Sequence, residues 1–374
     1  MLNSWDRMTS ALNLEEPDRV PLFEMHAPSE VVSSVLKKRS LYQNIPLILN
    51  LLSSGVDPVR LNKIIAKEAL EFHRRLGLDW IRVPMAYSRS TKVKRLGWNT
   101  WLIGNTRYYY SAGSLWWLDE PATYDPEEVL SKARCSPPEV DYDGLDILKE
   151  LAKRVKERLF LSFDADGSWG PIVSRPKLLV HVLLWMRTRR DVVRSLIDYH
   201  TRFAIELGKA AIDEGADAIL MCVDYGHAKG PWFSPTYFRE FIKPALRMQV
   251  NAFKRRGAYA ILHSDGNIDS LLSDIVDAGV DAYQGIDVIA GMNLAKVKRL
   301  YGDRICLIGN VNPRVLQYGS KRDVANEVVR CMNQGAPGGG YVLSTSANVS
   351  AGTNVENFLY MIELARRIQE YPRP

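Results

Sequence analysis

The chain lacks several features that would place it at a membrane or outside the cell. None of its apolar runs approaches the roughly 18 residues that cross a bilayer. The first residues, MLNSWDRMTSALNLEEPDR, contain no apolar core of a signal peptide. The cysteines are scattered and form no CxxC pair, which is typical of reduced thiols and argues against a disulfide framework. We therefore expect a cytoplasmic protein that makes no membrane contact.

The chain also lacks a large excess of either positive or negative charge. The 374 residues carry 49 Lys and Arg against 43 Asp and Glu, a formal charge of +6, and no long uninterrupted block of one sign. This balance favours a small anionic substrate or an acidic protein partner, and we expect no nucleic-acid partner. The chain also contains no internal repeat and no low-complexity tract.

What the sequence does contain is one pattern repeated about eight times: a short apolar run, one or two polar residues, and a helical stretch. Apolar runs of this length favour parallel strands buried on both faces. Alternating strands and helices of this number predict a single (β/α)8 TIM barrel over residues 1–374, an α/β fold. The predicted strands are at 19–27, 80–87, 159–167, 218–226, 259–266, 281–287, 305–312 and 341–347.

Two segments depart from this pattern. Residues 88–125 have turn signals between short runs rich in Tyr and Trp, which predicts a β-ribbon flap inserted in the N-terminal half, near the barrel mouth. Residues 176–200 are helical and strongly apolar at their start, so we expect them to pack against a partner subunit.

Polar residues stand where the predicted strands end. In a barrel the C-terminal strand ends and the following loops form the active-site face. The candidate site residues in chain order are therefore Glu24, His26, Asp164, Asp166, Asp224, His227, His263, Asp265, Gln284, Asp287, Asn310, Asn312, Ser344 and Ser346.

Alternation along the strands sharpens this set. Residues two apart share a face, so Cys222 with Asp224, and His263 with Asp265, point in the same directions. If both pairs face inward, they can bind zinc or support acid and base catalysis through His263. The simpler alternatives are a buried structural thiol for Cys222 and a helix cap for Asp265.

At this point the sequence resembles a known family. The segments DRVPLF, DYGHAKGPWFSPTYFREFIKP, LHSDGNIDSLLSDIVDAGVDAYQGID, AGMNLAKVKRLYGDRICLIGNVNP and GGGYVLSTSANVSAGTNVENFLYMIELAR are similar to the uroporphyrinogen decarboxylase superfamily. The resemblance implies one (β/α)8 barrel, often in a homodimer. It also implies either a cofactor-free decarboxylase or a methyltransferase that exchanges a methyl group with a corrinoid.

The departures from the family pattern favour the methyltransferases. The decarboxylases carry an arginine-rich loop after the first strand, whereas this chain reads FEMHAPSEV there. They also carry a late His in a GHG context, where this chain has Ser346, Ala347 and Asn348. The thiol-activating methyltransferases bind zinc through His-x-Cys and a later Cys. His263 matches that pattern, but Asp265 and Ala347 stand near the two cysteine positions.

The chain therefore resembles the branch that moves methyl groups from methoxylated compounds to a corrinoid protein. An ether oxygen leaves poorly unless it is protonated or polarised by a metal. We expect His263, Asp224, His227 and Asp265 to be catalytic, and His263, Asp265 and Cys222 to hold any metal, for which zinc is the candidate. The remaining predicted substrate-binding residues are Glu24, His26, Tyr110, Asp164, Trp169, Tyr225, Gln284, Asn310, Ser344 and Ser346.

The expected partners are a methoxylated small molecule, for which an aromatic ring is one option, a corrinoid (cobalamin) carried by its own protein, and a second copy of the chain. The aromatic side chains could hold such a ring by stacking. Two alternatives stay open: a decarboxylase of uroporphyrinogen or a related carboxylate, and a barrel that binds a corrinoid or tetrapyrrole without catalysis.

Overall fold

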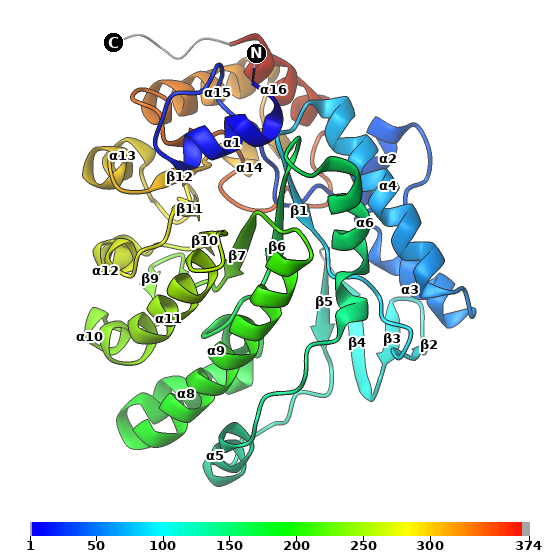
Figure 1. Cartoon of the computed structure of the whole chain (residues 1–374), viewed down its shortest axis with the longest axis vertical. Coiled ribbons are helices and arrows are strands. Elements are labelled where there is room, and N and C mark those ends of the chain that lie inside the picture. Colours follow the sequence, from blue (N-terminus) through cyan, green and yellow to red (C-terminus); the bar gives the residue numbers. More distant parts are fainter. Residues whose placement is uncertain (1, 112, 369–374) are drawn as a thin grey trace.

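A curled parallel sheet forms the centre of the protein, seen in a computed structural model that describes residues 2–111 and 113–368 (Figure 1). Its seven strands lie in the spatial order β1, β6, β7, β10, β11, β12, β13, and every neighbouring pair is parallel. Seven of the eight predicted apolar runs form these strands. They are β1 (Trp80–Val83), β6 (Phe160–Asp164), β7 (Ala218–Cys222), β10 (Tyr259–Ser264), β11 (Ala282–Gly285), β12 (Cys306–Ile308) and β13 (Tyr341–Val342).

The eighth run, residues 19–27, does not form the predicted strand. It makes one parallel bridge, between Leu22 and Leu343 beyond β13. On its other side the Leu22 carbonyl accepts a 2.8 Å hydrogen bond from the backbone N–H of Asp79, directly before β1. Pro21 removes one N–H from this segment, which limits regular pairing. The segment thus lies between the two outer strands of the sheet, and a closed eight-stranded barrel stays a prediction.

Helices surround the sheet (Figure 1). Apolar side chains on its outer face, such as Ile219 and Met221, belong to the same buried cluster as residues of the covering helices. The predicted helix over 176–200 is two helices, α8 and α9, interrupted at Arg189, which has an extended φ of −143°. The helices are α1 (Ser4–Leu12), α2 (Ser29–Leu36), α3 (Ile45–Ser53), α4 (Pro58–Leu76), α5 (Pro126–Arg134), α6 (Asp146–Val155), α7 (Gly170–Val173), α8 (Pro176–Thr188), α9 (Arg190–Asp213), α10 (Pro235–Tyr237), α11 (Lys243–Lys254), α12 (Leu272–Asp277), α13 (Leu294–Tyr301), α14 (Pro313–Tyr318), α15 (Lys321–Gly335) and α16 (Val355–Arg367).

The inner face of the sheet is apolar at the N-terminal ends of the strands. Trp80, Phe160, Leu220 and Ile261 lie there in one fully buried cluster, which α1 covers with Met8, Ala11 and Leu12. Side chains alternate along a strand, so the residues two positions further on share this inner face at the opposite end. On β1, β7 and β10 those residues are Arg82, Cys222 and His263.

A separate antiparallel sheet occupies residues 93–117 and is called the flap below. Its strands β2 (Val93–Arg95), β3 (Thr100–Ile103), β4 (Thr106–Ser111) and β5 (Ser114–Trp117) pair in sequence order. Trp101 anchors the flap to α3, because its side chain is fully buried and its Nε1 donates to Asn50 Oδ1 at 3.2 Å. A small hairpin, β8 (Gly226–His227) with β9 (Gly230–Pro231), follows β7.

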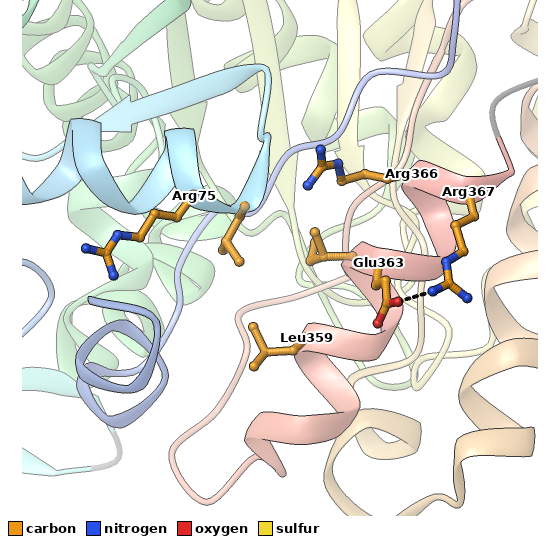
Figure 2. Close-up of a pocket in the computed structure, with 7 residues that line it drawn as sticks. Arg75, Leu359, Glu363, Arg366 and Arg367 are labelled. Atoms are coloured by element: carbon orange, nitrogen blue, oxygen red, sulfur yellow. Dashed lines mark hydrogen bonds and ion pairs between the residues drawn. The ribbon is translucent and has the colours of Figure 1, made fainter. Parts of the chain in front are cut away.

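The end of the molecule that carries the N-terminal strand ends has its own surface hollow. Figure 2 shows it between α4 and α16, with a volume of about 360 Å³. Three of its charged groups have structural partners, because Glu363 pairs with Arg367 and Arg75 pairs with Glu71. Among the described residues, no helix has the length and apolarity that a membrane crossing requires.

Candidate active site

His263 is the central side chain of the candidate site. It lies on β10 directly between Cys222 of β7 and Gln284 of β11, with which it is in register. Its inner-face position leaves it only 3% exposed, above the apolar layer formed by Ile261 and its neighbours. The parallel pairing of β10 with both neighbours therefore fixes where the imidazole stands.

The hydrogen bonds of Gln284 determine which nitrogen of His263 carries a proton. The Gln284 amide nitrogen donates to the carbonyl of Thr345 at 3.1 Å, so its Oε1 faces His263 Nδ1 and accepts from it. A neutral imidazole has one N–H, which this contact places on Nδ1. Nε2 then presents its lone pair on the opposite side of the ring, as a metal ligand or a proton acceptor.

Two carboxylates face that nitrogen. His263 Nε2 lies 3.4 Å from Asp224 Oδ1 and 3.8 Å from Asp265 Oδ1. The loops hold both, because Asp224 Oδ1 accepts the backbone N–H of Asp265 at 2.9 Å and Asp224 adopts a left-handed φ of 39°. A non-glycine residue in that region costs about 1–3 kcal/mol, and such strain clusters at functional sites.

Asp265 is poorly satisfied by the protein itself. Its Oδ1 is buried and has no hydrogen-bond partner among the described residues. Burial raises the pKa of Asp265 to about 6, and the neighbouring Asp224 and Asp287 charges add to the rise. A carboxylate oxygen left without a donor is available to a bound group.

The three residues fit a metal ion. One ligand atom from each of Asp224, His263 and Asp265 lies within 4.8 Å of the others. Zinc accepts this combination of imidazole and carboxylate ligands, and three protein ligands leave a fourth position open. The Gln284 contact on Nδ1 is the outer hydrogen bond that orients histidine ligands in metal sites.

Cys222 belongs to a second group. Its thiol lies with the carboxylates of Asp164 and Asp166, within the same 4.8 Å limit, and not with His263 and Asp265. Burial raises the pKa of this thiol well above its ordinary value, which keeps it protonated. The structure thus divides the predicted ligand set of His263, Asp265 and Cys222 between two adjacent clusters.

Arg82 is a residue of this second group that the sequence reasoning missed. Its Nε donates to both carboxylate oxygens of Asp164, at 3.1 and 2.9 Å, and its Nη2 lies 3.6 Å from Cys222 Sγ. Burial raises the pKa of Asp166 to about 7, with the Asp164 charge adding to the rise and Arg82 opposing it. A charged residue within the buried run WIRV was the available signal, because a buried charge requires a partner.

Beside Arg82 a cavity of about 250 Å³ opens beneath the flap. His26 and Glu30 line it from the N-terminal segment, and Tyr110 and Ser114 line it from β4 and β5. Burial lowers the pKa of His26, and the charge of Arg82 lowers it further. Two predicted substrate-binding residues therefore line one cavity: His26 with a neutral imidazole and Tyr110 with a phenol.

Glu24 is buried and protonated. Its Oε1 accepts the backbone N–H of Thr345 at 2.9 Å, and its Oε2 lies 2.8 Å from Thr345 Oγ1. That hydroxyl has a single proton and also lies 2.6 Å from the carbonyl of Ala347. If the Thr345 hydroxyl donates its proton to the Ala347 carbonyl, the proton in its contact with Glu24 must come from the carboxyl group of Glu24. Burial raises the pKa of Glu24 to about 8, which agrees with this assignment.

Other predicted site residues lie outside these clusters. His227 packs its ring against Trp232 at 4.7 Å. Trp169 and Tyr225 are fully buried beside Phe233, so their ring faces contact the core. Asn310 donates to the Ile286 carbonyl and accepts from Arg330. Ser344 and Ser346 are almost fully buried, and their hydroxyls have no hydrogen-bond partner among the described residues.

Known proteins are similar to this chain in sequence and in fold. Methylcobamide:CoM methyltransferase MtaA from Methanosarcina barkeri is 26% identical over 308 residues, covering 80% of this chain and 83% of that protein. The uroporphyrinogen decarboxylase of Geobacter metallireducens is 27% identical over 180 residues, and the match spans 48% of this chain and half the length of that relative. The solved structure of a methyltransferase from Methanosarcina mazei covers 99% of this chain and is itself covered completely, with a TM-score of 0.73 and 20% identity, which supports the fold.

The family model decides membership. The model described as uroporphyrinogen decarboxylase (URO-D) matches residues 133–368, which is more than half of the chain and includes β6 to β13. The match to the Methanosarcina barkeri methyltransferase is longer than the part of the chain that this model covers, and the fold of the Methanosarcina mazei methyltransferase covers 99% of the chain. The protein belongs to the uroporphyrinogen decarboxylase family and resembles its corrinoid methyltransferase branch.

Proposed function

We propose that the protein is a corrinoid-dependent methyltransferase that removes a methyl group from a methoxylated small molecule. The observation that carries this proposal is the cluster of His263 Nε2 with the carboxylates of Asp224 and Asp265. His263 lies near the C-terminal end of β10, and Asp265 and Asp224 directly follow β10 and β7, where catalytic groups of α/β barrels stand. An imidazole with two hard carboxylates suits an oxygen leaving group better than a thiolate.

The chain's own residues can position and protonate such a substrate. His26 and Tyr110 line the cavity beside Arg82 and offer polar contacts to a small molecule. Asp166, which is not one of the proposed zinc ligands, has a pKa raised to about 7 by burial and can hold a proton near neutral pH. General acids with pKa values close to the working pH transfer protons efficiently, and an alkoxide or phenoxide leaving group requires that proton.

Two groups would complete the chemistry. Zinc would be held by His263, Asp224 and Asp265, and when bound it supplies a Lewis acid that polarises the ether oxygen. The corrinoid supplies the cobalt nucleophile and would come on its own protein. A closed barrel, a homodimer and a cytoplasmic location belong to the same proposal.

A decarboxylase is the second candidate, favoured by the match to the Geobacter enzymes. That reaction requires cationic side chains that grip carboxylates. Arg82 is the arginine at the cavity, but Asp164 occupies its guanidinium. The methyltransferase therefore fits the charges of the site better. A barrel that binds a corrinoid without catalysis is the third candidate.

One assay separates the three. The protein is incubated with cob(I)alamin and a panel of methoxylated aromatic and aliphatic compounds, with and without added zinc, and methylcobalamin formation is followed by absorbance. We expect transfer from at least one compound, and none from the corresponding hydroxyl compounds. Release of carbon dioxide from uroporphyrinogen without methyl transfer would support the decarboxylase. Corrinoid binding with neither reaction would support the carrier.

A further inference from the structure

A second cavity lies away from the His263 cluster, and none of its lining residues belongs to that site. It has a volume of about 380 Å³ and is bounded by the end of the flap, the N-terminal part of α8, and the facing sides of α5 and α9. Ligand pockets for small molecules begin at about this size. Trp117, Tyr124, Arg175, Leu178, Leu196 and His200 are among the residues that line it.

The walls of this cavity suit a planar ring. Trp117, Tyr124 and Tyr199 contribute aromatic surface, while Leu178 and Leu196 add buried aliphatic surface. The Arg175 guanidinium lies over the Trp117 ring, 5.2 Å from its centroid, which fixes both side chains without using the N–H groups of either. Aromatic and aliphatic walls bury a flat apolar body, and rings prefer to stack on or edge toward such surfaces.

The buried polar groups of the cavity are nitrogens without partners, while Glu128 and Lys132 line it as exposed side chains of opposite charge. The indole N–H of Trp117 is buried and has no acceptor among the described residues, and the Nε2 of His200 is likewise buried without a partner. Within the same described part of the chain, the Arg175 guanidinium makes no ion pair or hydrogen bond. The nearby Asp125 is already engaged, because its Oδ1 caps α5 through the N–H groups of Glu127 and Glu128.

Buried donors without acceptors are costly, at about 1–3 kcal/mol for each group, unless something else supplies the acceptor. A carboxylate supplies up to four acceptor positions and the negative charge that an unpaired guanidinium requires. The three nitrogen groups, from Trp117, Arg175 and His200, belong to three different elements that converge on the one cavity. The Trp117 N–H and the Arg175 guanidinium match the acid group of a ligand whose ring lies against the aromatic walls. His200 is a neutral imidazole, because burial lowers its pKa to about 4, and its Nε2 is left for a further polar substituent.

From this geometry we propose that the cavity between the flap, α5, α8 and α9 is a binding site for a small aromatic carboxylate. Arg175 and the Trp117 N–H hold the acid group, His200 holds a further polar substituent, and the leucine and tyrosine side chains enclose the ring. Strand β5 of the flap connects the two cavities. Its last residue, Trp117, lines this one, and its first residue, Ser114, lines the cavity beside Arg82.

The test is a binding measurement and does not depend on methyl transfer. Benzoate, 4-hydroxybenzoate and benzamide are titrated into the full-length protein, with tryptophan fluorescence and calorimetry as readouts. We expect saturable binding of the two acids and at least about tenfold weaker binding of benzamide, because the amide lacks the charge that Arg175 pairs with.

Matched variants locate the ligand. Arg175→Met keeps the aliphatic stem on Trp117 and should weaken benzoate binding at least about tenfold. Arg187→Met, at an exposed arginine in the last turn of α8, should not weaken it. Trp117→Phe keeps an aromatic ring without the N–H and should weaken binding by a smaller factor. His263→Ala should leave benzoate binding unchanged. Absence of saturable binding, equal affinity in Arg175→Met, or loss of binding in His263→Ala would each overturn the proposal.

Discussion

The polar side chains at the two ends of the central sheet differ in how completely they are hydrogen-bonded. At the N-terminal ends, Asp79, Asp217 and Asp281 each accept a backbone N–H of a neighbouring segment and at least one side-chain donor. At the C-terminal ends, Asp265 Oδ1 and the hydroxyls of Ser344 and Ser346 are buried without a partner among the described residues. The same kinds of side chain are thus saturated at one end and unsatisfied at the other.

This difference separates stability from function. The aspartates at the covered end fix the register of the strands and attach α1, so they contribute to the folded state. Unsatisfied groups at the open end cost free energy in the empty protein, at about 1–3 kcal/mol each. Such unsatisfied groups are retained at sites where a bound ligand or the reaction itself supplies the missing hydrogen bonds. Substitutions at the two ends should therefore change different measurable quantities.

The largest expected effect is on stability, from Asp79→Ala. The Asp79 side chain is fully buried and pairs with Arg7 and Arg19, at 2.7 and 2.8 Å. Removing it leaves Arg7 with Asp18 as its remaining carboxylate partner and takes the acceptor from the buried N–H of Leu22. The substitution should lower the free energy of unfolding by about 3–5 kcal/mol, measured by urea denaturation. Turnover per folded molecule should stay near wild type. Asp303→Ala, at an exposed position, is the control, and equal stabilities of the two variants would contradict the comparison.

His263→Ala should give the opposite result at the other end. The variant removes a proposed zinc ligand or acid, so methyl transfer should fall at least about a hundredfold. The free energy of unfolding should change much less than in Asp79→Ala. His181→Ala, on the solvent side of α8, serves as the matched histidine control. Near wild-type transfer in His263→Ala would remove this residue from the reaction.

Gln284→Leu tests the outer hydrogen bond of the cluster. The leucine keeps the approximate volume but removes the acceptor of His263 Nδ1–H, so the imidazole loses its orientation. Zinc affinity should fall about 10–100-fold, measured by competition with a chelating dye. Gln284→Glu retains an acceptor toward Nδ1 and should bind zinc at least as tightly as wild type. Identical affinity in the leucine variant would show that Gln284 does not orient a ligand.

Much of the fold could be predicted from the sequence, because buried parallel strands are continuous apolar runs with recognisable helices between them. The alternation rule predicted that Cys222, Asp224, His263 and Asp265 converge if both pairs face inward. The structure brings the last three together but places Cys222 in the adjacent cluster. The first run failed as a strand, since RVPLFEMHA contains a proline and lies between the two outer strands, where one bridge and single hydrogen bonds replace a ladder.

The parts that could not be predicted depend on where strands end in three dimensions. Arg82 was missed because a single arginine in an apolar run has no local partner; Asp164 comes 82 residues later. Trp169 and Tyr225 looked like substrate-stacking residues from their position after strands, but their direction depends on how the following loops turn, and both rings point into the core. Cys222 is the last residue of β7, two positions before Asp224, yet its thiol lies with the carboxylates of Asp164 and Asp166.

At low pH the smallest expected effect is that of a substitution at Glu24, a buried acid that uses its own proton for a hydrogen bond. Glu24→Gln places an amide donor where the acid proton stands and should leave the free energy of unfolding within about 1 kcal/mol of wild type at low pH, near 4. The two proteins should then diverge as the pH rises. The folded-state pKa is about 8 and the ordinary value 4.5, so between these values the unfolded chain has released a proton that the folded chain retains. Wild type should therefore lose stability relative to Glu24→Gln from about pH 4.5 up to about pH 8, and the difference should level off above that, as followed by urea denaturation across the range. A difference that is flat with pH, or that runs in the other direction, would mean that Glu24 is ionised in the folded protein and that Thr345 Oγ1 donates to it.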